Sequence, residues 1–324
     1  MKIVFFGTPE YVVPVVKLLN KKLKKGNETP VVAVVTQKPK PTGRKQFLAY
    51  SAVDTWAHKR GVPIYFNPLD VIENKVDAEI GVLASYGAIV PGAVINYFKY
   101  GIINIHPSLL PKFRGASPVQ ATLVTNSQAG ATLIKIDSQL DHGPILAQFK
   151  EDTLVDDTTK TLRDRLFVRA AEVIVGLIPA YMAGKIKIKA QNHAEATTTR
   201  QIKKEDTFIP PKYLNAALQG RTLKNKWNIP FIKDCLLVPN ANCLERFIRA
   251  MNPWPIAWTF VKLNPVDKEP KRLKIIKAHL KPKSVNEKRS MDFSLIIDEV
   301  QLEGKTEVSW KQFTEGYPKF AFPS

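Results

Sequence analysis

Gly101-Ile102-Ile103-Asn104-Ile105-His106 is a short, mostly apolar run with the character of a buried β-strand. Residues two apart on a strand point to the same side, so we expect Asn104 and His106 to share one face at its carboxyl end. Pro107 cannot donate to a sheet ladder and should end the strand. In open α/β sheets, ligands bind outside the carboxyl ends of the strands. The two polar side chains are therefore candidate site residues.

The residues that follow add a carboxylate to this pair. Ser108-Leu109-Leu110-Pro111 comes directly after the strand, and Asp141 lies further on in Leu140-Asp141-His142-Gly143. An amide, an imidazole and a carboxylate suit attack on a carbonyl by a nucleophile that the substrate supplies. The amide and imidazole stabilise an oxyanion, and the carboxylate orients the imidazole and relays a proton. An isolated Asn-x-His would more simply cap a strand, but the ordered motifs favour a catalytic site.

Apolar strands alternate with helical stretches through the first part of the chain. Unbroken apolar strands in such an alternation indicate an α/β domain, with a Rossmann-like, mostly parallel sheet covered on both faces. Gly7-Thr8-Pro9 lacks the G-x-G-x-x-G pattern, so the fold predicts no dinucleotide site by itself. Strands are expected over residues 2–6, 31–36, 80–84, 102–106, 131–136 and 145–149, and helices over 10–20, 51–60, 91–98 and 159–183.

The pattern changes toward the carboxyl terminus. We predict a catalytic domain over residues 1–183, a linker over 184–208 and a smaller β-rich domain over 209–324. Short apolar runs separated by turn residues indicate an OB-like barrel there. Trp254 and Trp310 are expected to anchor its core.

Composition limits the classes of function. The chain has 324 residues and 44% hydrophobic residues, which is normal for a globular protein of two domains. No apolar run approaches the ~20 residues that span a bilayer. Cys235 and Cys243, without His partners, make no metal site. The net charge of +19, densest toward the carboxyl terminus, favours a polyanionic partner, although a lysine-rich proteome would give the same excess.

Taken together, these motifs resemble the methionyl-tRNA formyltransferase family over nearly the whole chain. The catalytic set alone is less specific, because all folate-dependent formyltransferases share it, whereas the second domain narrows the acceptor to tRNA. The matching stretches are residues 1–10, 104–118, 140–143, 245–255, 301–305 and 309–310.

The resemblance implies a reaction and its residues. A formyl group would pass from 10-formyltetrahydrofolate to the α-amino group of initiator methionyl-tRNA, for translation initiation and without a metal. Asn104, His106 and Asp141 would carry catalysis. The pterin ring is expected against backbone near residues 84–90 and the Asp141 loop. The folate-binding residues would be Ser108, Leu109, Leu110, Pro111, Tyr86 and Gly87.

The resemblance also implies an RNA-binding loop. The stretch 38–45 is rich in Lys, Pro and Gly and stands where the family has a basic loop that enters the acceptor stem. We expect Arg44, Lys45 and Lys204 to contact tRNA, with Arg44 carried over from the family. A solvated turn is the alternative for this loop. His142 departs from the family, which more often has a small or hydroxyl residue there, and adds a titratable ring beside Asp141.

Partners and location follow from the same resemblance. We expect a monomer without membrane contact, in the bacterial cytosol rather than an organelle matrix. Two alternatives remain open at this point. One is a formyltransferase acting on a sugar nucleotide or another small amine, which would not need a basic second domain. The other is a folate- or RNA-binding protein that has lost turnover, against which the intact Asn104, His106 and Asp141 argue.

Overall fold

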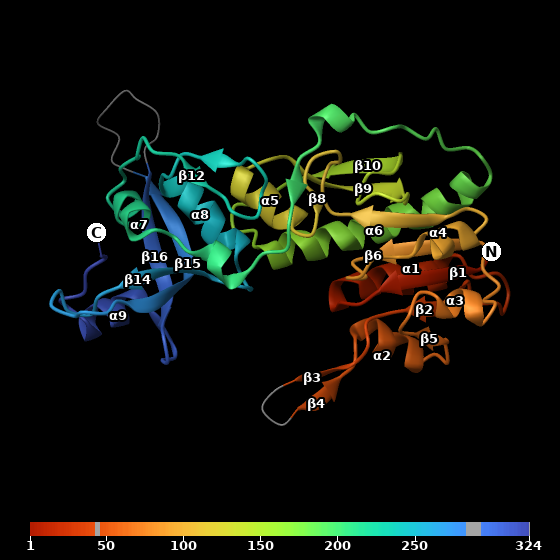
Figure 1. Ribbon diagram of the computed structural model, residues 1–324, viewed down its shortest axis with the longest axis horizontal. Coiled ribbons are helices and arrows are strands. Elements are labelled where there is room, and N and C mark those ends of the chain that lie inside the picture. Colours follow the sequence, from red (N-terminus) through yellow and green to blue (C-terminus); the bar gives the residue numbers. More distant parts are fainter. Residues whose placement is uncertain (43–45, 283–292, 324) are drawn as a thin grey trace. The chain divides into compact units, whose positions relative to one another are not determined.

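The structure is a computed structural model that describes residues 1–42, 46–282 and 293–323. The chain divides into two compact units, each formed from several stretches of sequence (Figure 1). The first comprises Met1–Arg114, Ala129–Asp152 and Arg163–Ala196, and the second Gly115–Gln128, Thr153–Leu162 and Thr197–Ser324. Within the described ranges, no helix combines the length and apolar character that crossing a membrane requires.

A seven-stranded sheet forms the centre of the first unit, in the order β10-β9-β7-β6-β1-β2-β5. The strands from β7 to β5 are parallel, whereas β9 runs antiparallel to both β7 and β10. The strands are β1 (Ile3–Gly7), β2 (Val31–Val35), β5 (Ile64–Tyr65), β6 (Ile80–Ala84), β7 (Ile102–His106), β9 (Ala129–Lys135) and β10 (Ile145–Glu151).

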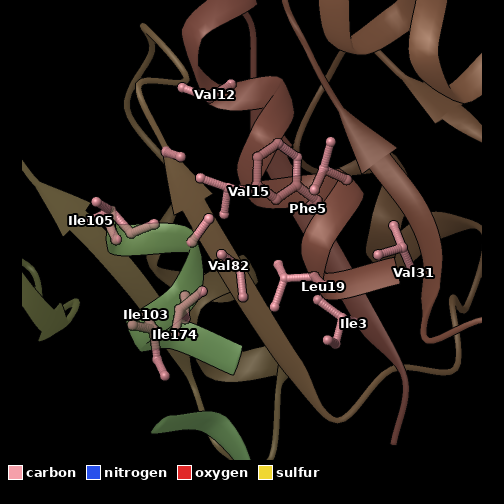
Figure 2. Close-up of a cluster of buried hydrophobic side chains, with 14 of the residues drawn as sticks. Ile3, Phe5, Val12, Val15, Leu19, Val31, Val82, Ile103, Ile105 and Ile174 are labelled. Carbon is pink, nitrogen blue, oxygen red and sulfur yellow. The ribbon is translucent and has the colours of Figure 1, made fainter. Parts of the chain in front are cut away.

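Helices cover this sheet on both faces. The helices of this part of the chain are η1 (Glu10–Val12), α1 (Val13–Lys22), α2 (Ala52–His58), α3 (Asp70–Glu73), α4 (Gly92–Tyr97), α6 (Thr159–Met182) and η2 (His193–Glu195). One buried cluster joins α1, α2 and α6 to one face of the sheet (Figure 2). A second cluster, with Phe6, Val94 and Phe98, covers the other face.

The alternation of side chains along β7 places its apolar and its polar residues on opposite faces of the strand. Ile103 and Ile105 point into the cluster that α1 and α6 cover. Asn104 and His106 therefore project from the opposite face of the strand. Because β7 lies between β6 and β9, its carboxyl end is held on both sides by neighbouring strands. The predicted Rossmann-like, mostly parallel fold is confirmed, and all ten strands and helices expected in residues 1–183 are present within a few residues of their predicted ends.

The second unit contains a four-stranded antiparallel sheet in the order β14-β15-β16-β17. It consists of β14 (Ala257–Val261), β15 (Lys271–Pro282), β16 (Phe293–Leu302) and β17 (Glu307–Ser309), with the helices α5 (Pro118–Thr125), η3 (Lys204–Thr207), α7 (Pro211–Leu218), α8 (Ala241–Ala250) and α9 (Trp310–Gly316). Short strands complete the chain: β3 (Lys40–Thr42), β4 (Phe47–Ala49), β8 (Arg114–Gly115), β11 (Thr198–Thr199), β12 (Trp227–Asn228) and β13 (Leu236–Leu237).

The expected β-rich character of the carboxyl-terminal part is confirmed, and closure into a barrel stays a prediction. Its helices α7 and α8 were not anticipated. Trp310 packs on Phe313 with ring centroids 5.3 Å apart, as expected of an anchor. Trp254 is 54% exposed, so its assignment to the core was wrong. The boundaries at residues 183 and 208 stay a prediction; the compact units instead place residues 115–128 and 153–162 with the carboxyl-terminal part.

An ion pair between a half-exposed arginine and a buried carboxylate fixes the start of the second unit's carboxyl-terminal stretch. Arg200 donates from Nη1 and Nη2 to the two oxygens of Asp206, at 2.6 and 2.7 Å. The backbone N–H of Lys203 donates to Asp206 Oδ2 at 2.7 Å, which caps η3. Hydrogen bonding from Arg200 holds the pKa of Asp206 below its ordinary value of 3.8.

Asp206→Asn should lower the free energy of unfolding by about 1–2 kcal/mol at pH 7, because Arg200 loses a charged, bidentate partner while remaining half exposed. Since the folded-state pKa is depressed, this stabilisation is present above the ordinary pKa and disappears as the pH falls through the folded value. Urea unfolding from pH 7 to pH 3 measures it. A difference between variant and wild type that grows toward pH 3 would contradict the assignment.

Candidate active site

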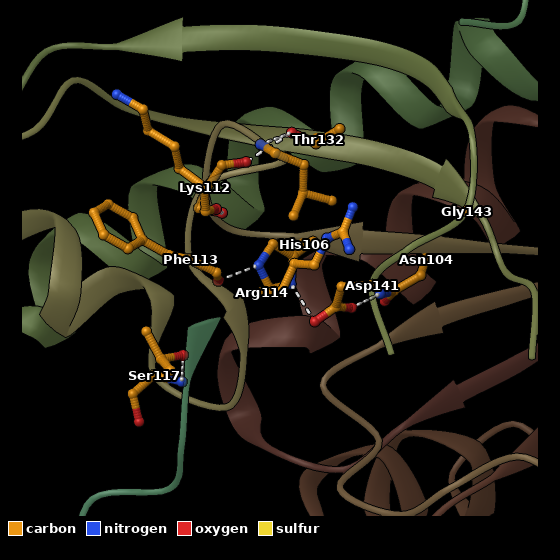
Figure 3. A network of polar contacts seen from close by, with 12 residues as sticks. Asn104, His106, Lys112, Phe113, Arg114, Ser117, Thr132, Asp141 and Gly143 are labelled. Carbon is orange, nitrogen blue, oxygen red and sulfur yellow. Dashed lines mark hydrogen bonds and ion pairs between the residues drawn. The ribbon is translucent and has the colours of Figure 1, made fainter. Parts of the chain in front are cut away.

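Asp141 joins the two polar side chains of β7. Asn104 Nδ2 donates to Asp141 Oδ1 at 3.2 Å, and His106 Nδ1 lies 3.4 Å from Asp141 Oδ2. Figure 3 shows the three side chains turned toward one another at the carboxyl end of β7. The side chains of His106 and Asp141 are only 5% and 8% exposed. The structure thus brings together the amide, imidazole and carboxylate that the sequence singled out.

The imidazole of His106 stands between two acceptors. Its Nε2 lies 2.9 Å from the carbonyl oxygen of Phe113, and its Nδ1 faces the Asp141 carboxylate. A neutral imidazole donates from one nitrogen only. The ring can donate from Nε2 to the Phe113 carbonyl, and one proton between Nδ1 and the Asp141 carboxylate then makes the second contact a hydrogen bond as well. For His106 to donate to a substrate oxygen, one of these two contacts has to give way.

Asn104 has donor capacity beyond this contact. A side-chain amide carries two N–H groups, so donation to Asp141 leaves one for an oxygen bound at the carboxyl end of β7. The amide is 9% exposed, and in such surroundings a hydrogen bond to a developing negative charge is stronger than in water. The arrangement suits stabilisation of an oxyanion next to a carboxylate that can take up a proton.

The Asp141 loop connects β9 to β10 and turns sharply. Asp141 has a φ of 50°, a left-handed conformation that Asp tolerates better than most residues. A Cβ on Gly143 would lie 1.8 Å from the Lys135 carbonyl oxygen, so the loop passes too close to β9 for any side chain there. His142 projects from the loop, and its Nδ1 lies 2.7 Å from Asp137 Oδ2.

The chain's similarity to known proteins identifies its family. The formyl transferase profile matches residues 1–178, and the formyl transferase C-terminal domain profile matches residues 239–318. A methionyl-tRNA formyltransferase from Chloroflexus aggregans is 34% identical over 267 residues, which cover 80% of this chain and 76% of the relative. The chain belongs to the methionyl-tRNA formyltransferase family.

Further relatives agree with this membership. A methionyl-tRNA formyltransferase from Listeria innocua is 32% identical over 271 residues, covering 82% of this chain and 77% of the relative. Among solved structures, the N-formyltransferase from Helicobacter canadensis, in complex with folinic acid and dTDP-3-aminofucose, aligns with a TM-score of 0.62 at 17% identity, covering 92% of this chain and 98% of that one. At this identity the alignment shows the fold alone.

A polar network holds the loop of residues 108–111, where this family member is expected to bind folate. The Thr132 hydroxyl donates to the Ser108 carbonyl at 2.7 Å and accepts from the Leu110 N–H at 3.0 Å. Gln148 donates from Nε2 to Thr132 Oγ1 at 2.8 Å and to the Leu110 carbonyl at 3.0 Å. The Ser108 hydroxyl itself donates to the Lys112 carbonyl. The loop backbone is therefore fixed from β9 and β10.

The other predicted folate-binding residues lie after β6. Tyr86 is 2% exposed, and its ring packs edge-on against Phe6. Burial raises the pKa of Tyr86, so the phenol stays neutral. The side chain belongs to the core, and only the backbone near Tyr86 and Gly87 offers a surface for a ligand. Thr8 ties this loop to the end of β1 by donating to the Tyr86 carbonyl at 2.8 Å.

The predicted tRNA-binding residues lie apart in the sequence. Arg44 and Lys45 fall outside the described residues, although the flanking β3 and β4 pair as a hairpin, with Phe47 70% exposed. Lys204 is exposed at the start of η3 in the second unit. These three assignments stay predictions, as do the catalytic and folate-binding ones.

The residues that support the site carry no recognisable motif in the sequence and were not predicted. Thr132 lies opposite His106 in the β7–β9 pair, and Gln148 lies opposite Thr132 in the β9–β10 pair. Strand pairing is the only signal that relates them to His106. The sequence shows that Thr132 and Gln148 are polar residues inside apolar strands, but it does not show which strands pair with each other.

Thr132→Val should lower the free energy of unfolding by about 2–4 kcal/mol, because its hydroxyl serves two buried backbone groups, the Ser108 carbonyl and the Leu110 N–H, and each unsatisfied group costs ~1–3 kcal/mol. Thr122→Val is the matched control, since its equally buried hydroxyl donates to the Pro118 carbonyl within α5. Denaturant unfolding of both variants gives the comparison. Equal losses in the two variants would show that Thr132 has no special role in holding the loop.

Proposed function

We propose that this protein transfers the formyl group of 10-formyltetrahydrofolate to the α-amino group of methionyl-tRNA, with initiator tRNA as the substrate. Membership of the family makes it a formyltransferase. One observation carries the proposed mechanism: the Asp141 carboxylate meets Asn104 and His106 at the carboxyl edge of the sheet. Relatives named for this reaction are 32–34% identical over at least 80% of the chain.

The chemistry follows from the three groups. An α-amine has a pKa of ~7.7–8.0, and an adjacent ester lowers it further, so part of the acceptor is neutral and nucleophilic near pH 7. Its nitrogen attacks the formyl carbon, and Asn104 donates to the oxygen that becomes negative. Asp141 takes the amine's proton and returns it to the folate nitrogen as that carbon–nitrogen bond breaks. His106 shares the proton through its contact with Asp141.

The fixed loop of residues 108–111 supports a donor site next to these groups. Its backbone is held by Thr132 and Gln148, which positions a ligand without reorganisation during the reaction. The backbone of Tyr86 and Gly87 follows β6, the parallel neighbour of β7, so it ends at the same sheet edge. The Helicobacter canadensis relative was solved with folinic acid, a formylated folate. We infer that the folate lies between these two loops.

The second unit supports a polyanionic acceptor. Exposed cationic side chains lie along β15, including those of Lys271 and Lys277, and the Arg272 guanidinium lies over the Trp258 ring. Base-independent contacts between such cations and phosphates dominate the affinity for nucleic acids. We propose that residues 209–324 supply the affinity for tRNA and that residues 1–183 carry out the chemistry. Arg44, Lys45 and Lys204 would contact the RNA. We further propose that the protein acts as a monomer in a bacterial cytosol.

Asp141→Asn and His106→Ala should each lower kcat for methionyl-tRNA formylation by about 100- to 1,000-fold, the usual effect of losing a proton acceptor or an oxyanion donor. Asp298→Asn is the matched control, because Asp298 forms another Asp–His pair, 2.8 Å from His279 in the second unit. Steady-state formylation with circular dichroism of each variant gives the result. Near wild-type turnover in Asp141→Asn would refute the catalytic role.

Binding of methionyl-tRNA should weaken steeply as salt rises, because several phosphates are contacted. Arg44→Ala should reduce the slope of log affinity against log salt by about one, the loss of a single phosphate contact. Filter binding at several salt concentrations measures both slopes. If the affinity does not change with salt and the protein formylates an amino-sugar nucleotide, then the acceptor is a small amine rather than tRNA.

A further inference from the structure

Gln191 makes four hydrogen-bonding contacts with a buried side-chain amide. It follows α6 and is 6% exposed. Its Nε2 donates to the Asp141 carbonyl at 2.8 Å and to the Gly143 carbonyl at 2.7 Å. Its Oε1 accepts from Arg114 Nε at 3.2 Å and Nη2 at 2.7 Å. Carbonyls on one side and a guanidinium on the other fix which end of the amide carries nitrogen.

These contacts hold the Asp141 loop on both sides of His142. Asp141 adopts a left-handed backbone conformation, which is unfavourable for an L-residue. Two N–H donors aimed at the carbonyls of residues 141 and 143 offset this cost and stabilise the turn. Such a turn sets the direction in which the Asp141 side chain leaves the backbone. The Gln191 amide therefore contacts the backbone from which the Asp141 carboxylate extends toward Asn104 and His106.

A second path ties the same segment to the loop. Arg114 Nη2 lies 2.8 Å from His193 Nδ1, and the rings of His193 and His142 stack at 3.9 Å with an interplanar angle of 2°. Partial desolvation and the nearby His142 and Arg114 charges lower the pKa of His193, so its Nδ1 accepts from Arg114. Gln191 therefore contacts the backbone of the loop, and His193 contacts the side chain of His142.

We propose that Gln191 is a positioning residue of the reaction, which holds the Asp141 carboxylate against Asn104 and His106 through the loop backbone. Arg114 orients the Gln191 amide for this task. The proposal rests on the proposed function, because it assumes that Asp141 is the proton acceptor. A Gln that only satisfied buried carbonyls would contribute to stability and leave the chemical step unchanged.

Gln191→Met keeps the length and volume of the side chain and removes its donors. Gln191→Glu keeps the acceptor for Arg114 and removes the donors, which gives a second variant should the first fail to fold. Both should lower kcat by about 10- to 100-fold, as displacement of a reacting group by ~1 Å does, with KM for methionyl-tRNA changed less than about threefold. Asn192→Ala is the control. It removes the adjacent side chain, which accepts from the Ala194 N–H, and should keep wild-type kcat.

The effect should depend on Asp141. In an Asp141→Asn background, Gln191→Met should lower the residual rate by less than about threefold, because residues that act as a unit are not additive. If Gln191→Met lowers the rate by the same 10- to 100-fold in that background, the proposal is overturned, since Gln191 would then act independently of Asp141. Wild-type kcat in both Gln191 variants would overturn it directly.

A spectroscopic readout separates this proposal from the proposed function. The ¹⁵N signals of the His106 ring report which nitrogens carry hydrogen, and they should change in Gln191→Met but not in Asn192→Ala at the same pH. If the wild type fails to formylate methionyl-tRNA and the signals still change, the proposed function fails while the positioning role stands. Unchanged His106 signals in both Gln191 variants would refute positioning even in an active formyltransferase.

Discussion

The Asp141 carboxylate has to reach two side chains on one face of β7, and the site depends on this constraint. Asn104 and His106 are two residues apart, so their direction is set by the pleat of the strand. Asp141 arrives from a different part of the chain, on the turn between two antiparallel strands. Because β9 pairs directly with β7, the turn begins beside the strand that carries its partners. The topology of the sheet edge therefore brings the three groups together.

Burial makes the cluster depend on complete pairing. A polar group removed from water without a partner costs free energy, and Asn104 and His106 are 9% and 4% exposed. Asp141 offers one oxygen to each of them, and the Phe113 carbonyl faces the remaining nitrogen of His106. The site is thus organised before a substrate binds. The same pairing means that a substrate oxygen has to compete with an existing contact of His106.

Much of this arrangement was predictable, because it follows local rules. The spacing of Asn104 and His106 placed them on one face, and the strands around Asp141 were visible as apolar runs. The sequence did not identify three supporting residues, Thr132, Gln148 and Gln191. Polar residues of these types are common, and their contacts with the site arise only from the pairing of strands and from the path of the chain after α6. The helix α8 has buried residues at helical spacing, including Leu244, Phe247 and Ile248, but it was not predicted because the short apolar runs around it indicate strands. The assignment of residues 115–128 to the second unit depends on contacts distant in sequence, such as the packing of α5 on α8.

A crystal structure of the full chain with a stable formylated folate would test the central claim most directly. We expect the formyl oxygen within about 3 Å of Asn104 Nδ2, the hydrogen-bond distance for an amide donor, with the pterin between the loop of residues 108–111 and the backbone near Tyr86. We also expect that Asp141 keeps its contact with Asn104 or His106. A folate bound away from the carboxyl end of β7, or an Asp141 carboxylate turned away from both partners in that complex, would contradict the account.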